Sequence, residues 1–134
     1  MKKEAEEIRK KFDGKLIGSE KMQELVCETI SVFPKDIVDF VTNHVWFVGS
    51  FDDAWGFVLK VEELNAKGKY LVFLGDELFE QDHYSQKYEI AHEIGHVILK
   101  HRNAILKPQT KEEIACQEKE AHEFAIRYVG RGEL

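Results

Sequence analysis

The stretch KYEIAHEIGHVILKH, residues 87–101, holds two histidines four positions apart, with a glutamate directly after the first. These residues, His92, Glu93 and His96, spell HExxH. Side chains four positions apart on a helix lie one turn apart on the same face, so both imidazoles can reach one ion. Imidazole nitrogen suits Zn²⁺, and a neighbouring carboxylate can take a proton from the attacking water. The stretch therefore predicts a metal site on a helix.

Apolar residues surround this motif on a helical wheel of about 100° per residue. One face carries only apolar residues, namely Ile90, Ala91, Ile94 and Ile98. The two histidines lie on the other face, among Tyr88, Gly95 and Leu99. Burying two imidazoles and a carboxylate without partners is unfavourable, and a shared metal ion supplies a partner. We therefore expect a buried helix with a metal site, and not a solvated helix with an incidental His-Glu-His trio.

A catalytic zinc usually takes three protein ligands and keeps a fourth position open. The last predicted helix, which Thr110 can cap and which runs from Lys111 to about Val129, supplies candidates for the third ligand. Its apolar stripe comprises Ile114, Ala121, Ala125, Tyr128 and Val129. Glu118 lies inside this stripe and His122 on its edge, one turn along. Glu118 is therefore the preferred ligand, while His122 either contacts a ligand or binds the metal itself; a buried Glu118–His122 pair without metal is the alternative.

The remaining sequence predicts an α+β fold in a single domain, residues 1–134. Ser19 can cap one N-terminal helix, and Pro34 fits the first turn of the next. Three runs rich in Val, Phe, Trp and Tyr follow, separated by Gly, Asp and Asn: HVWFVG (44–49), AWGFVLKVEEL (54–64) and GKYLVFLGDEL (68–78). Such runs are typical of strands and turns. We expect a small three-stranded, mostly antiparallel sheet, then the HExxH helix from about Gln86 to His101 and the final helix.

Composition narrows the class of protein. The chain has 134 residues, 43% of them hydrophobic, which suits one core. Its net charge of −6, with lysines scattered among acids, leaves no basic stripe for direct nucleic-acid binding. The first residues lack the apolar run of a secretion signal, and no window approaches the roughly 18–20 apolar residues of a membrane span. We expect a cytoplasmic protein with a protein or peptide partner, in which Cys27 and Cys116 stay reduced.

The two motifs together resemble a known family. YEIAHEIGHVILKH followed by EKEAHEFA resembles the ImmA/IrrE zinc metallopeptidases, in which a helix of the form AHExGHxxLH precedes a helix carrying ExEAxxFA. The resemblance is concentrated in residues 86–126. It implies a zincin-like fold, one Zn²⁺ held by His92, His96 and Glu118, and Glu93 as general base. Family members commonly have Asn at the position of His122.

The resemblance also implies a function. Family members often act on phage or mobile-element repressors, cutting or inactivating them to release gene expression. We therefore expect a zinc metalloendopeptidase that cleaves a transcriptional repressor. Two other hypotheses remain open: a zinc-containing binding module that inactivates a regulator without proteolysis, and a metal-free partner in a toxin or repressor system.

Residues near the start of the HExxH helix complete the expected site. His83, Tyr84 and Tyr88 are hydrogen-bond donors and therefore candidates to stabilise the tetrahedral oxyanion of peptide hydrolysis. The preceding run KYLVFLG, residues 69–75, can pair with an extended substrate if it lies at the edge of the sheet. An ordinary core strand explains this run equally well.

Overall fold

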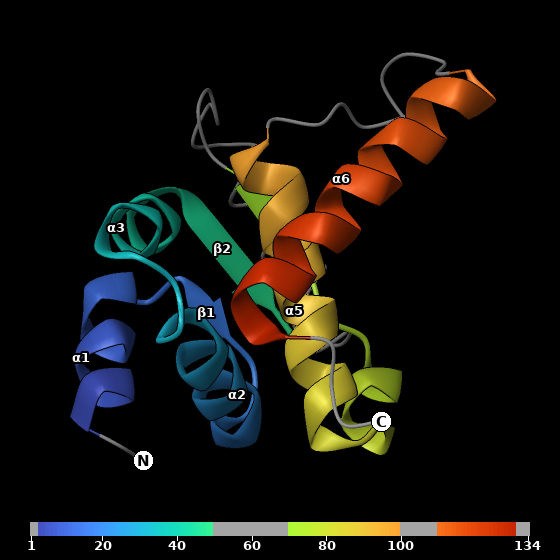
Figure 1. Cartoon of the computed structure of the whole chain (residues 1–134). Helices are drawn as coiled ribbons and strands as arrows, with labels where there is room; N and C mark the ends of the chain where they lie inside the picture. Colours follow the sequence, from blue (N-terminus) through green and yellow to red (C-terminus); the bar gives the residue numbers. More distant parts are fainter. Residues whose placement is uncertain (1–2, 50–69, 100–109, 131–134) are drawn as a thin grey trace, which may run out of the picture.

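The computed structural model describes residues 3–49, 70–99 and 110–130 of the chain. In Figure 1 the first three helices gather at one end of the molecule and the last two at the other, with short strands between them. The elements are α1 (Lys3–Phe12), β1 (Leu16–Ile17), α2 (Glu20–Ile30), α3 (Lys35–His44), β2 (Val45–Val48), β3 (Tyr70–Phe73), the 3₁₀ helix η1 (Asp76–Glu80), α5 (His83–Ile98) and α6 (Lys111–Val129). No described helix is both long and apolar enough to cross a membrane.

Hydroxyl caps start α2 and α6 where the sequence predicts them. The Ser19 hydroxyl oxygen accepts a hydrogen bond from the Met22 backbone N–H at 3.1 Å, and that of Thr110 accepts one from Glu113 at 3.0 Å. Each such cap typically stabilises a helix by about 1 kcal/mol. Pro34 differs slightly from the prediction, because it is the residue before α3 and not part of its first turn.

Helix α5 begins three residues earlier than expected, at His83. The reason is Asp82, whose carboxylate accepts hydrogen bonds from both the backbone N–H and the hydroxyl of Ser85, each at 2.9 Å. The helix is described as far as Ile98. The predicted end of this helix at His101, like the following loop with Pro108, lies outside the described residues.

The described strands form a three-stranded sheet in the order β1-β2-β3, and both pairs are parallel. Leu16 lies opposite Phe47, and Val45 lies opposite Tyr70. The expectation of a mostly antiparallel sheet is therefore wrong for these strands. The run at 54–64, expected as a strand, lies outside the described residues, and the two-residue β1 was not predicted.

The sequence of β2 explains the parallel arrangement. Val45, Phe47 and Val48 are buried and Trp46 is half-buried, so apolar side chains follow one another without polar alternation. A continuous apolar run marks a strand covered on both faces, which is typical of parallel sheets, whereas antiparallel sheets often expose one polar face. Parallel neighbours also cannot be joined by a tight hairpin.

The core extends from the N-terminal helices through β2 to α5. The largest fully buried side chains in it are Phe12, Phe47, Met22, Ile30, Ile90 and Ile94. Helix α5 contacts α2 on one side and α6 on another. The same core that holds α2 therefore also fixes one face of the helix that carries HExxH.

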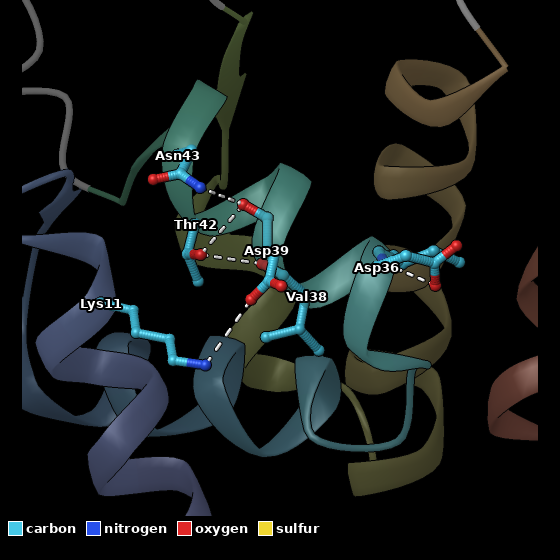
Figure 2. A network of polar contacts seen from close by, with 7 residues as sticks. Lys11, Asp36, Val38, Asp39, Thr42 and Asn43 are labelled. Atoms are coloured by element: carbon cyan, nitrogen blue, oxygen red, sulfur yellow. Dashed lines mark hydrogen bonds and ion pairs between the residues drawn. The ribbon is translucent and has the colours of Figure 1, made fainter.

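Polar contacts join α1 to α3 at the margin of this core (Figure 2). Lys11 reaches across from α1, with Nζ 3.6 Å from Oδ1 of Asp39. Within α3, the buried Thr42 hydroxyl donates to the Val38 carbonyl at 2.8 Å, and the Asn43 side chain donates to the Asp39 carbonyl at 2.8 Å. The Thr42 hydroxyl is thus satisfied inside its own helix, as a buried polar group requires.

Candidate metal site

Three predicted ligand residues meet where α5 and α6 pack together. The rings of His92 and His96 lie one turn apart on α5, with centroids 4.7 Å apart and planes nearly perpendicular. Glu118 approaches from α6: its Oε2 lies 3.0 Å from Nε2 of His92, and its Oε1 lies 3.1 Å from Nε2 of His96. One ligand atom from each residue lies within 4.8 Å of the others. The cluster is a possible metal site.

The donor set and its spacing fit a zinc ion. Zinc binds imidazole nitrogen and carboxylate oxygen at about 2.0–2.2 Å, so ligand atoms around a tetrahedral ion lie about 3.3–3.5 Å apart. The nitrogen–oxygen distances of 3.0 and 3.1 Å are slightly shorter, which is the spacing of direct His–Glu contacts. Small movements of these side chains would admit an ion. Two nitrogens and a carboxylate also leave room for a fourth ligand, as in catalytic sites.

Gly95 allows the two helices to approach each other beside the histidines. A Cβ at this position would lie 3.0 Å from Cδ1 of Phe124 and 3.3 Å from Cα of Ala121, closer than ordinary contact. Ala121 and Ala125 are fully buried in the same interface. Small residues on both helices therefore set a short distance between the axes of α5 and α6. This short distance brings Glu118, about one turn before Ala121, within reach of α5.

The site is more open than the helical wheel predicted. The side chains of His92 and His96 are 14% and 21% exposed, but that of Glu118 is 55% exposed. Ile114 and Leu99, both expected to be buried, are 41% and 40% exposed. The wheel gives the direction of a side chain but not the extent of the partner surface, and the N-terminal turns of α6 extend away from the other labelled helices (Figure 1).

The charges around His92 favour its protonated form. Interaction with the Glu93 carboxylate, whose Oε1 lies 3.9 Å from Nδ1, is the main cause that raises the pKa of His92. Burial acts in the opposite direction, while the nearby charge of Glu118 raises the pKa further. A metal ion at this site would therefore compete with a proton on His92, because only neutral imidazole binds metals.

Tyr88 and His122 form a second link between the two helices. The Tyr88 hydroxyl is hydrogen-bonded to Nδ1 of His122 at 2.5 Å, and the Tyr88 ring stacks on His92 at 5.8 Å between centroids. Burial, followed by the negative charge of Glu89, raises the pKa of Tyr88. His122 thus contacts a neighbour of the metal cluster, and within the described residues it is not part of a group that could hold a metal.

The other two predicted oxyanion donors, His83 and Tyr84, lie at the start of α5, farther from the cluster than Tyr88. The Tyr84 hydroxyl donates a hydrogen bond to the Gly130 carbonyl at 2.6 Å, which ties the start of α5 to the end of α6. His83 lines a separate pocket with residues of α1 and α2, including Glu4 and Glu28. It lies nine residues before His92, about 13 Å along the helix axis.

The sequence reasoning missed Glu89. This residue forms, with His92 and Glu93, a second group whose ligand atoms lie within 4.8 Å of one another. Its spacing of three and four residues from His92 and Glu93 was a usable signal, since such residues share a helix face. Glu93 itself has a side chain that is 44% exposed, so solvent reaches its carboxylate.

Comparison of the chain with profiles of known protein families, with curated proteins and with solved structures finds no match.

Proposed function

We propose that this chain is a zinc-dependent metalloendopeptidase. The observation that carries the proposal is the convergence of His92, His96 and Glu118, with the carboxylate of Glu93 beside His92. The resemblance of the two helix motifs, which contain these same residues, to the ImmA/IrrE metallopeptidases also supports it. In this proposal His92, His96 and Glu118 hold one Zn²⁺, and Glu93 is the general base.

Each side chain then has a defined task. When bound, a zinc ion would polarise the scissile carbonyl and lower the pKa of water. Glu93 accepts the proton of the attacking water and passes it to the leaving amine. Its partly exposed carboxylate lies beside His92, where both water and an extended peptide can reach it.

Tyr88 is the best placed of the three candidate oxyanion donors. It is the one that contacts a ligand residue, through the stacking of its ring on His92. The hydrogen bond between its hydroxyl and His122 holds that hydroxyl on the side of α5 that faces α6, where Glu118 also lies. In the proposed mechanism Tyr88 donates to the developing oxyanion.

The proposed substrate is a protein, and by resemblance a transcriptional repressor of the phage or mobile-element type. Strand β3 is the terminal strand of the described part of the sheet and precedes α5 in the chain. Leu74 and Gly75, directly after β3, line a pocket together with Glu93, so an extended peptide that added to this strand would have one end near Glu93. A module that binds zinc and sequesters the regulator without cutting it is the alternative outcome of the experiment below.

The test is cleavage by protein whose zinc content has been measured. Zinc-loaded wild-type protein is incubated with unfolded casein and with a candidate repressor, and the products are identified by mass spectrometry. Glu93→Gln should retain one zinc per chain and lose at least about 100-fold in cleavage rate, because it removes the general base. Glu123→Gln, an exposed carboxylate on α6, is the matched control and should cleave normally.

Two results would contradict the proposal. Equal cleavage by Glu93→Gln and wild type removes Glu93 as the base. Stoichiometric zinc without cleavage of either protein, combined with tight binding of the repressor, favours the binding module instead.

A further inference from the structure

A pocket of about 170 Å³ lies between α5 and the segment that follows β3. Glu93 forms part of its wall, so the pocket opens beside the proposed general base. Glu89 forms another part, and its carboxylate lies within 4.8 Å of a ring nitrogen of His92. The pocket therefore adjoins the candidate metal site.

The wall opposite α5 has an apolar part, which backbone hydrogen bonds hold in place. Leu74 and Leu78, which line it, are 6% and 7% exposed. The Leu74 N–H donates to the Val48 carbonyl at 2.8 Å, extending the ladder between β2 and β3, and the Leu78 N–H donates to the Gly75 carbonyl at 3.1 Å. This side of the pocket is formed before any ligand arrives.

The polar part of the lining is acidic. Besides Glu93 it includes Glu77 on η1 and Glu89 on α5, both exposed, together with the neutral Gln81, and none of the described lining residues is basic. Lysine and arginine have long aliphatic stems that pack on apolar surface while their charged ends stay in water or meet carboxylates. Leucines on one wall and carboxylates at the opening complement such a side chain, whereas an acidic side chain would be repelled.

We propose that this pocket receives the lysine or arginine side chain of a substrate residue next to the scissile bond. The inference rests on the proposed peptidase function and adds a substrate class to it. Pockets for whole small molecules usually measure about 300–1,000 Å³, so the smaller space here suits one side chain. Its position beside Glu93 places that side chain at a residue flanking the bond to be cut.

Amino-acid hydroxamates test the pocket without any cleavage, because their hydroxamate group binds zinc. L-lysine hydroxamate and L-norleucine hydroxamate share the same aliphatic stem and differ by the terminal ammonium group. Titration calorimetry on the zinc-loaded chain should show about fivefold tighter binding of the lysine compound at low salt, since an exposed ion pair contributes up to about 1 kcal/mol. The preference should shrink as salt rises.

The double variant Glu77→Gln with Glu89→Gln should bring the affinity ratio to about one. Its matched control is Glu7→Gln with Glu123→Gln, which removes the same charge from exposed positions on α1 and α6 and should keep the ratio. Equal affinities in the wild type, tighter binding of the norleucine compound, or binding of neither overturns the inference. Two zinc ions per chain would also overturn it, by showing that Glu89 binds metal. Absence of peptide cleavage with the hydroxamate preference intact refutes only the peptidase proposal.

Discussion

Helices α2 and α6 start in the same way but are held in place differently. Ser19 caps the first and Thr110 the second, each through a hydrogen bond from a backbone N–H three residues on. In α2, six of eleven residues are buried: Met22, Leu25, Val26, Cys27, Thr29 and Ile30. In α6, only Ala121 and Ala125 of nineteen residues are buried. Similar local signals therefore produce one helix that is mostly buried and one that packs on α5 but leaves most of its residues partly or fully exposed.

This difference places one ligand candidate on a helix with few fully buried residues. Helix α6 supplies Glu118 from a turn whose nearest buried residue on the same helix is Ala121, three positions on, while α5 supplies the two histidines from a helix packed on the core. An ion bound by all three residues would join α6 to α5. By binding the folded state alone, it would add stability to the helix that burial stabilises least.

Replacing a matched pair of isoleucines should give the largest contrast. Ile30 on α2 is fully buried, whereas Ile114 on α6 is 41% exposed. We expect Ile30→Ala to lower the free energy of unfolding by about 2–5 kcal/mol, because it leaves a cavity in the core. Ile114→Ala should lower it by less than about 1 kcal/mol. Urea unfolding of both variants measures the difference, and equal losses would mean that the exposed turn of α6 is packed after all.

Replacing Glu118, the proposed ligand on α6, should have the next largest effect, which is a loss of zinc affinity. Glu118→Ala should weaken zinc binding at least about 100-fold, since two histidines alone make an incomplete site. His122→Ala is the matched control one turn along the same helix and should bind zinc within about tenfold of wild type. Competition with a chromophoric chelator gives both constants. If Glu118→Ala binds zinc as wild type does and His122→Ala binds it more weakly, the third ligand is His122.

Hydrogen exchange extends the same comparison to the helices themselves. Adding zinc to wild-type protein at 100 times its Kd should stabilise the folded state by about 2.7 kcal/mol. The slowing of amide exchange should be greater in α6 than in α2, because opening of α6 breaks the site. Uniform slowing of both helices would show that α6 opens only with the whole fold.

Much of the fold was predictable because its signals are local. The caps at Ser19 and Thr110, the helical spacing and the bounds of α6 all follow from residues close together in sequence. The direction of the strands was not predictable in this way. Pairing of Val45 with Tyr70 is a contact between distant residues, and the sequence around β2 predicts only a strand in a mostly antiparallel sheet.

The candidate site was partly predictable for a related reason. The pairing of His92 with His96 follows from helix geometry, and Glu118 was found as a carboxylate on the expected apolar stripe. The exposure of the Glu118 side chain could not be predicted, since it depends on how much of α6 is covered by the surface of α5. The contact of Tyr88 with His122 joins two helices and leaves no periodic signal in either.

Adding one methyl group at Gly95 should disturb the close contact between α5 and α6. The added Cβ would crowd Phe124 and the Ala121 backbone, which typically destabilises a well-packed core by about 1–3 kcal/mol. Alanine favours helix by about 1 kcal/mol over glycine, so we expect Gly95→Ala to lower the free energy of unfolding by a net value of roughly 0–2 kcal/mol and to weaken zinc binding. Gly75→Ala is the control, because a Cβ there meets nothing within 4 Å. If Gly95→Ala is as stable as wild type and binds zinc normally, close approach at Gly95 is not required.

The smallest effect near neutral pH concerns Cys27, which lies in the buried face of α2. Burial raises the pKa of its thiol to about 12, although the positive charge of Arg9 acts in the opposite direction. A raised pKa means that the folded state keeps the proton after the unfolded state has lost it. This contribution to stability is complete below about pH 9 and is lost as the pH rises toward 12.

Cys27→Ala removes this titration. Between pH 7 and pH 10, wild type should therefore lose about 1 kcal/mol more stability than Cys27→Ala does. Cys116→Ala, at an exposed position on α6, should keep most of the wild-type slope. Thermal or urea unfolding at the two pH values measures how stability changes with pH. Equal changes for wild type and Cys27→Ala would mean that folding does not raise the pKa of Cys27.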